Sequence, residues 1–208
     1  MPAVPQGRPH PKRKGSIRVG PPTPSKLAKA FAEHLMSRLG EADLIRRMDG
    51  HEGQPPVHFF VYRNLPSPGK TTYVTFGLCL GNHLEWRYSK PELVLTVDSD
   101  EEDWGIAAAY FVRELRGELP FHPGTLLTLE EPIADGSEMT GFVVCAQDVF
   151  KGLDAAIMVG TTCIQFIGLC PIYTEEAAVI QDEGIERFVE KLQDPHNPIR
   201  PPVEPDED

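Results

Sequence analysis

The sequence predicts an α+β fold, with a mixed, largely antiparallel sheet and flanking helices. Two runs of β-branched and aromatic residues, 57–63 and 71–80, are separated by a loop rich in proline, which favours a β-hairpin. Three other segments carry apolar residues at helical spacing. The expected order of elements is helix, strands, helix, strands, helix, and hairpin-like neighbours within it favour the α+β class.

Both ends of the chain differ from its middle. Of the 21 prolines, seven lie in residues 1–25 and five in residues 194–208. Proline has no backbone N–H to donate, and segments poor in apolar residues do not form a core. We therefore expect a disordered, basic, proline-rich tail over residues 1–25, one domain over residues 26–193, and a disordered, acidic, proline-rich tail over residues 194–208.

The first helix is expected to begin after Ser25, a residue type that caps helix N-termini well. Gly40 interrupts this helix, after which the helical spacing resumes and stops at Gly50. The apolar positions that carry the pattern are Leu27, Phe31, Leu35, Leu39, Leu44, Ile45 and Met48.

The second half of the chain is expected to combine short strands with two helices. Asp103 caps one helix, which Gly117 ends, and Thr174 opens the other, with Gly184 weakening its middle. The strands expected here cover residues 92–97, 125–129, 142–146 and 163–167.

The chain is acidic, and its charge is unevenly distributed. It contains 20 Lys+Arg and 31 Asp+Glu, a net charge of −11, whereas residues 1–26 hold six basic residues and no acidic ones. An acidic body repels phosphate backbones and attracts basic partners, so we expect no binding of nucleic acid. The sequence shows no apolar run long enough to cross a membrane, no secretory signal and no CxxC pair, which predicts a cytoplasmic protein.

A nucleotide-binding function is the alternative that Gly69, Lys70 and Thr71 raise. These residues match the end of a P-loop, and Asp98 follows an apolar strand as a metal-binding carboxylate would. A P-loop, however, needs a glycine where Asn64 stands, and it leads into a helix that holds the phosphate. Here strand-forming residues follow instead. A protein that binds another protein is therefore the favoured prediction, and a nucleotide-binding enzyme is the less favoured alternative.

Residues 98–103 include five acidic residues, but they do not match a calcium-binding loop, because the required glycine and glutamate are absent. This acidic loop either caps the helix beginning near Trp104 or docks a basic partner through Asp100, Glu101 and Glu102. The seven histidines lack zinc-ligand spacing, and no nucleophile motif is present. We therefore expect no metal, no cofactor and no enzymatic activity.

Several blocks of this sequence resemble the Suppressor of fused (SUFU-like) domain, over residues 28–193. The resemblance begins with Tyr62-Arg63-Asn64 and continues through the proline-rich loop to the Tyr73–Leu78 run. Further matching positions are Glu92–Leu95, Trp104, Ala108, Tyr110, Gly124, residues 166–172, Thr174–Glu176 and Gly184.

The resemblance implies an α+β fold that binds another protein and catalyses nothing. Animal members of the family clamp an extended peptide of a transcription factor between two lobes, partly at sheet edges, and this sequence matches the first lobe. Short bacterial members are proposed to be immunity proteins of polymorphic toxin systems. We therefore expect an immunity protein that neutralises a basic toxin domain, with an adaptor or regulator of another protein as the alternative.

The resemblance also indicates where a partner binds. Peptide contacts in the animal members cluster near the strand that corresponds to Tyr73–Leu78 and in the loop after it. Trp and Tyr, with Arg, dominate the energetics of protein interfaces. The alternative is that Trp86 and Tyr88 continue a strand and pack internally. The residues expected to bind a partner are Tyr73, His83, Glu85, Trp86, Arg87 and Tyr88, together with Asp100, Glu101 and Glu102 of the acidic loop.

Overall fold

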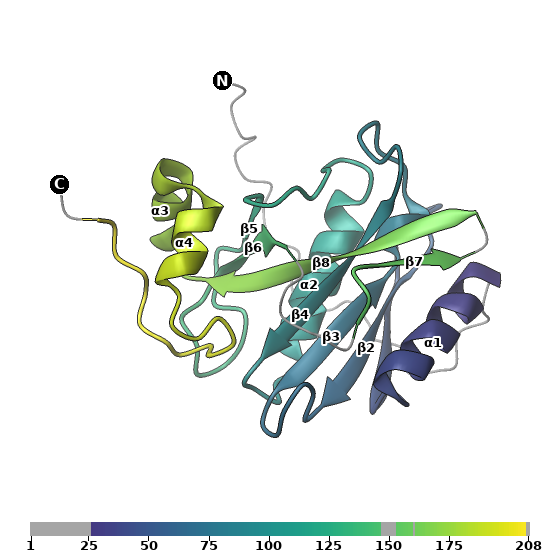
Figure 1. Cartoon of the computed structure of the whole chain (residues 1–208), viewed down its shortest axis with the longest axis horizontal. Coiled ribbons are helices and arrows are strands. Elements are labelled where there is room, and N and C mark those ends of the chain that lie inside the picture. Colours follow the sequence, from purple (N-terminus) through teal and green to yellow (C-terminus); the bar gives the residue numbers. More distant parts are fainter. Residues whose placement is uncertain (1–25, 147–152, 160, 207–208) are drawn as a thin grey trace.

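The structure is a computed structural model that describes residues 26–146, 153–159 and 161–206. It confirms the α+β class: a mixed sheet has the strand order β1-β2-β3-β4-β8-β6-β5, and β7 pairs with β8 (Figure 1). The strands are β1 (Leu44–Met48), β2 (Val57–Arg63), β3 (Thr71–Phe76), β4 (Lys90–Val97), β5 (Leu126–Thr128), β6 (Gly141–Cys145), β7 (Ala156–Val159) and β8 (Thr162–Ile172). The helices are α1 (Lys26–Leu39), α2 (Asp103–Leu115), α3 (Glu176–Glu183), α4 (Ile185–Lys191) and the 3₁₀ turn η1 (Leu78–Leu80).

The predicted hairpin is confirmed, because β2 and β3 pair antiparallel. Within the described residues, β4 and β8 form the one parallel pair, and the other pairs are antiparallel. The central strand β8 is long enough to pair with β7 near its start and with β6 near its end. Its length was underestimated from the sequence, and β7 was not predicted.

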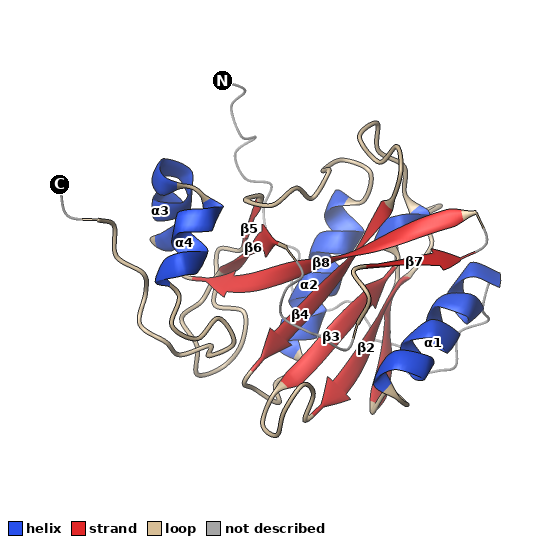
Figure 2. Cartoon of the chain, in the orientation of Figure 1, coloured by secondary structure: helices blue, strands red, loops and turns tan. Residues whose placement is uncertain are grey.

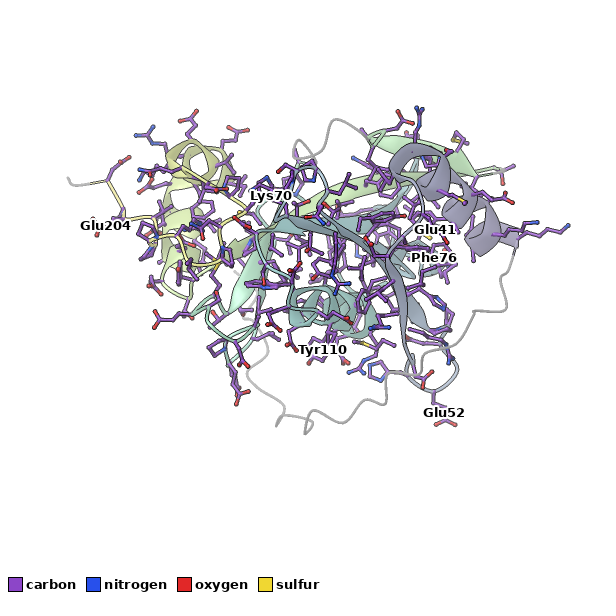
Figure 3. All side chains as sticks on the ribbon, turned by 90° about the horizontal axis from the view of Figure 1, so that it is seen from below. Glu41, Glu52, Lys70, Phe76, Tyr110 and Glu204 are labelled. Carbon is purple, nitrogen blue, oxygen red and sulfur yellow. The ribbon has the colours of Figure 1, made fainter. Side chains whose placement is uncertain are left out.

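Helices α1 and α2 cover opposite faces of the sheet (Figures 2 and 3). Side chains alternate along a strand, so Phe60 of β2 packs with Phe31 of α1, while its neighbour Phe59 packs in the cluster that contains Trp104 of α2. Gly105 lets α2 approach closely, because a Cβ atom there would lie 2.4 Å from the Tyr73 ring. The alternating burial thus follows directly from the pattern of the hairpin.

The prediction that the helical pattern resumes at Leu44 is wrong. Gly40, at φ +85°, follows the last turn of α1, and Leu44–Met48 form the edge strand β1 against β2. Short apolar runs do not distinguish a helix from a strand by spacing alone. Pairing with β2, a long-range contact, decides between the two.

The C-terminal residues also differ from expectation. Gly184, at φ +89°, separates α3 from α4. Residues 194–206, expected to be a disordered tail, pack along the domain: the Asp98 N–H donates to the His196 carbonyl (2.8 Å) and the Ser137 hydroxyl to the Pro198 carbonyl (2.5 Å). Backbone and polar contacts hold this segment, and a prediction based on its few apolar residues does not detect such contacts. The tail expected over residues 1–25 lies outside the described residues.

Candidate partner-binding surfaces

Apart from Tyr73, which lies in β3, the residues expected to bind a partner fall into two groups at opposite ends of β4 (Figure 1). The loop of residues 81–89 leads into this strand, and the acidic loop follows it. Eight residues of extended chain separate the groups by about 25 Å. The structure therefore does not combine them into one compact site.

Tyr73, expected to contact a partner, is a core residue of the folded domain. Its side chain is fully buried in β3, where its ring lies 6.3 Å from that of Phe59. Its hydroxyl donates to the Glu101 carbonyl at 2.9 Å, which ties the sheet to the acidic loop. A partner cannot reach Tyr73 unless the domain opens.

We expect Tyr73→Phe to lower the free energy of unfolding by about 1 kcal/mol, because one hydrogen bond is lost while the packing is kept. Urea denaturation measures this change. Tyr88→Phe is the matched control and should leave stability unchanged, since Tyr88 is 92% exposed. A loss of partner binding in Tyr73→Phe at unchanged stability would contradict the assignment of Tyr73 to the core.

The loop of residues 81–89 presents two large side chains to solvent. Leu84 is 91% and Tyr88 92% exposed, and Arg87 is also exposed. Trp86 instead packs against the core, and its indole N–H donates to the Pro120 carbonyl at 3.1 Å. The two aromatic residues thus have different roles: Trp86 anchors the loop, and Tyr88 remains available. Leu84 was not among the predicted residues, because nothing in its local sequence distinguishes it from a core leucine.

Polar contacts hold this loop in place. The Glu85 carboxylate lies 2.6 Å from the His122 ring, which lowers the pKa of Glu85. The Glu85 N–H donates to Nδ1 of His83 (3.2 Å). At the base of the loop, the Lys90 ammonium donates to the Gly81 carbonyl (2.8 Å) and to the Asn82 side chain (2.9 Å). The exposed side chains therefore sit on an anchored loop.

A buried glutamate supports the turn that precedes this loop. Glu92 of β4 accepts hydrogen bonds from the N–H groups of Gly77 (2.7 Å) and Cys79 (3.0 Å) and from the Thr75 hydroxyl (2.7 Å). Burial raises its pKa, although these donors act in the opposite direction. Arg116, just after α2, donates to the Gly77 carbonyl from the other side. Sequence reasoning did not single out Glu92 because its position reads as an ordinary strand residue.

In the acidic loop, Glu102 is already paired within the domain. Its carboxylate accepts two hydrogen bonds from Arg46, at 2.7 and 2.9 Å, and Arg63 lies 3.8 Å away. Arg46 lowers the pKa of Glu102. Asp100 and Glu101 are exposed, and Asp100 accepts a hydrogen bond from Thr71 at 3.3 Å. Glu102 therefore stabilises the fold, while its two neighbours remain accessible.

The P-loop alternative does not fit the structure. Residues 69–71 lead into β3, not into a helix. The Lys70 ammonium lies 3.9 Å from the Asp194 carboxylate, toward the C-terminal segment (Figure 3), and Thr71 is buried. A phosphate would find neither a helix N-terminus nor an unpaired lysine at this loop.

An acidic groove lies beside the N-terminal end of α2. It consists of two cavities, of about 430 and 420 Å³, that share Asp135. Asp98 and Asp135 line the first cavity, and Asp103, Glu131 and Asp135 line the second. Sequence reasoning missed this groove because its carboxylates come from two separate segments, which only the folded chain brings together.

Within the described residues, no group of three or more histidine, cysteine or acidic side chains is arranged to hold a metal ion. No described helix is long and apolar enough to span a membrane. Three of the four cysteines are buried, and burial raises the pKa of Cys145 to about 12, as it raises those of Cys79 and Cys170. These three thiols are packing residues of the core.

Comparison with known proteins identifies the fold. The chain is similar to a Suppressor of fused homologue from Neisseria gonorrhoeae, with a TM-score of 0.65 and 16% identity over 85% of this chain and 96% of that one. It is similar to a chain of a Sufu–Fu complex, with a TM-score of 0.58 and 14% identity over 80% of this chain and 84% of that one. It is also similar to Drosophila Suppressor of Fused, with a TM-score of 0.58 and 14% identity over 83% of this chain and 48% of that one. No curated protein matches.

The sequence profile of the Suppressor of fused protein (SUFU) family matches residues 53–201. The match begins before β2 and ends within the C-terminal segment that packs on the domain, so it covers β2 to β8, α2 to α4 and part of that segment, while α1 and β1 lie before it. The chain therefore belongs to the Suppressor of fused family.

Proposed function

We propose that this chain is a non-catalytic binding domain that acts in the cytoplasm as an immunity protein, neutralising a toxin domain. The observation that carries the binding role is the anchored loop of residues 81–89. Leu84 and Tyr88 are more than 90% exposed there, on a loop held by Trp86 and Lys90. Exposed large apolar side chains on a rigid support are favourable for binding, because little conformational freedom is lost.

The comparisons support this proposal at the level of the fold. The chain corresponds to almost the whole of the Neisseria homologue and to about half of the Drosophila protein. A related chain was crystallised in a complex with another protein, Fu. This complex favours a protein partner.

Charge supports a basic partner. The net charge of the chain is −11. Within the described residues, Glu101 forms no ion pair, and Asp100 forms one, with Arg63 at 4.0 Å. An acidic inhibitor accelerates its encounter with a basic partner and complements the charge of a nuclease-type cleft. The alternative function is that of an adaptor or regulator of a cellular protein, which the same exposed loop supports.

The experiment that tests the proposal is co-expression with the toxin domain encoded beside this gene. Rescue of growth, together with a complex that co-purifies, would support immunity. If the neighbouring product is not toxic, or the chain does not rescue growth, immunity is contradicted, and stable capture of a host regulator would favour the adaptor alternative. Thermal shift with nucleotide and magnesium tests the remaining enzymatic alternative, since a ligand of the native state raises stability.

We expect Leu84→Ala with Tyr88→Ala to weaken partner binding about 30-fold or more, since truncation of an interface hot spot costs about 2 kcal/mol or more. Titration calorimetry with the purified partner measures this loss. Met36→Ala with Val189→Ala is the matched control, because it removes exposed apolar side chains from α1 and α4. If both double variants bind the partner with equal affinity, the loop of residues 81–89 is not part of the interface.

A further inference from the structure

The acidic groove contains an unused hydrogen-bond donor. Trp104 lines the first cavity and is 1% exposed, and its indole N–H donates to none of the described residues. Among the residues that the structure describes, the fully buried polar side-chain atoms that lack a partner belong to His34, His58 and Arg200. The indole nitrogen is not among them, so it reaches the surface, and the surface that Trp104 lines is this cavity.

The carboxylates around that donor also lack cations. Asp98 and Asp135 flank the cavity of Trp104, with Asp103 and Glu131 in the adjoining cavity. Unlike Glu102, which is paired with Arg46, none of these four forms an ion pair within the described residues. Asp98, Glu131 and Asp135 are exposed. The groove thus offers one N–H donor and several acceptors for a cation.

A segment of extended, basic polypeptide provides both a hydrogen-bond acceptor for the indole N–H and cations for the carboxylates. Its lysine or arginine side chains pair with carboxylates, and its backbone carbonyls are free to accept, because a proline-rich extended chain makes no internal hydrogen bonds. The N-terminal part of this chain has that composition. Residues 8–14 contain four basic residues, no acidic residue, and prolines at positions 9 and 11.

The length of the N-terminal part is sufficient. Lys14 precedes the start of α1 by twelve residues and Arg8 by eighteen, which span up to about 40 and 60 Å when extended. A domain of this size is itself about 40 Å across. Tethering raises the local concentration of such a segment to the millimolar range, so a weak interaction is enough for occupancy.

We propose that residues 8–14 bind in the acidic groove, with a basic side chain between Asp98 and Asp135 and a backbone carbonyl on the Trp104 indole N–H. A basic partner that approaches this face then has to displace the chain's own segment, which lowers the apparent affinity for all but strongly basic partners. This inference does not depend on the proposed immunity function, because it concerns contacts within one chain.

NMR of the full-length chain tests the proposal without any partner. The chain has two tryptophans, and Trp86→Phe assigns their two indole N–H signals. We expect the Trp104 signal of Lys12→Glu/Arg13→Glu/Lys14→Glu to move away from the wild-type position while the Trp86 signal stays. Asp98→Asn/Asp135→Asn should move the Trp104 signal as well. In the wild type, NaCl at about 0.5 M should move this signal to the position seen in the triple variant of the N-terminal segment (the segment variant), because salt screens the charge pairing.

The matched control is Asp182→Asn/Glu186→Asn, which removes two exposed charges from α3 and α4. It should leave the Trp104 signal at the wild-type position. Coincident Trp104 signals in the wild type and the segment variant would overturn the proposal. So would a dependence of the signal on protein concentration, which would assign the segment to a second copy. The salt titration needs no variant, so a folding defect cannot obscure the result.

Discussion

Arg200→Met is expected to lower the free energy of unfolding by about 3–5 kcal/mol, because it leaves the Glu176 carboxylate buried without its cation. Both side chains are buried, and the guanidinium donates two hydrogen bonds to that carboxylate, at 2.5 and 2.9 Å. Arg200 also lies over the rings of Tyr173 and Phe188. Urea denaturation, followed by circular dichroism, measures the loss.

Two variants make this test specific. Arg187→Met removes an exposed arginine that pairs with Glu190 and Asp206, and its effect should stay within about 1 kcal/mol. Glu176→Gln/Arg200→Met should recover part of the loss, because the neutral amide no longer buries an unpaired charge. A cost of less than about 1 kcal/mol for Arg200→Met would show that the C-terminal segment contributes little to the fold.

Glu92→Ala is expected to cost about 4 kcal/mol, because three buried donors lose their acceptor together: the N–H groups of Gly77 and Cys79 and the hydroxyl of Thr75. Each unsatisfied buried group costs about 1–3 kcal/mol. Glu118→Ala, an exposed glutamate after α2, is the control and should change stability by less than about 0.5 kcal/mol. Because Glu92 supports the turn before residues 81–89, Glu92→Ala should also weaken partner binding.

Glu92→Gln keeps the shape of the side chain and removes its titratable carboxyl group, so it isolates the effect of the charge on stability. Burial raises the pKa of Glu92 above its ordinary value of 4.5, so the folded state keeps a proton that the unfolded state has released. The free energy of unfolding contributed by this group therefore falls as pH rises from about 4.5 through the folded-state pKa. The stability of the wild type relative to Glu92→Gln should decrease over that window. An increase would mean that the hydrogen-bond donors outweigh burial.

The candidate site shows how far local sequence reasoning extends. It selected the loop of residues 81–89 by its residue types, and the exposure of Arg87 and Tyr88 there agrees with a surface role. It did not distinguish Tyr88 from Trp86, whose indole N–H reaches Pro120, a residue 34 positions away. It grouped Glu102 with Asp100, although Arg46, from β1, neutralises only the former. Partners distant in sequence decide which side chains remain available.

Alternation and helical spacing are local consequences of side-chain geometry. For that reason the α+β class, the β2–β3 hairpin and the first two helices could be predicted from the residues alone. The sequence also contained the family relationship. The folded chain was needed to show that Leu44–Met48 form a strand, that residues 194–206 pack on the domain, and that Asp98 and Asp135 share a cavity. Those features depend on contacts between segments that are distant in sequence. Such contacts form only when the chain folds, so no local pattern of residues predicts them.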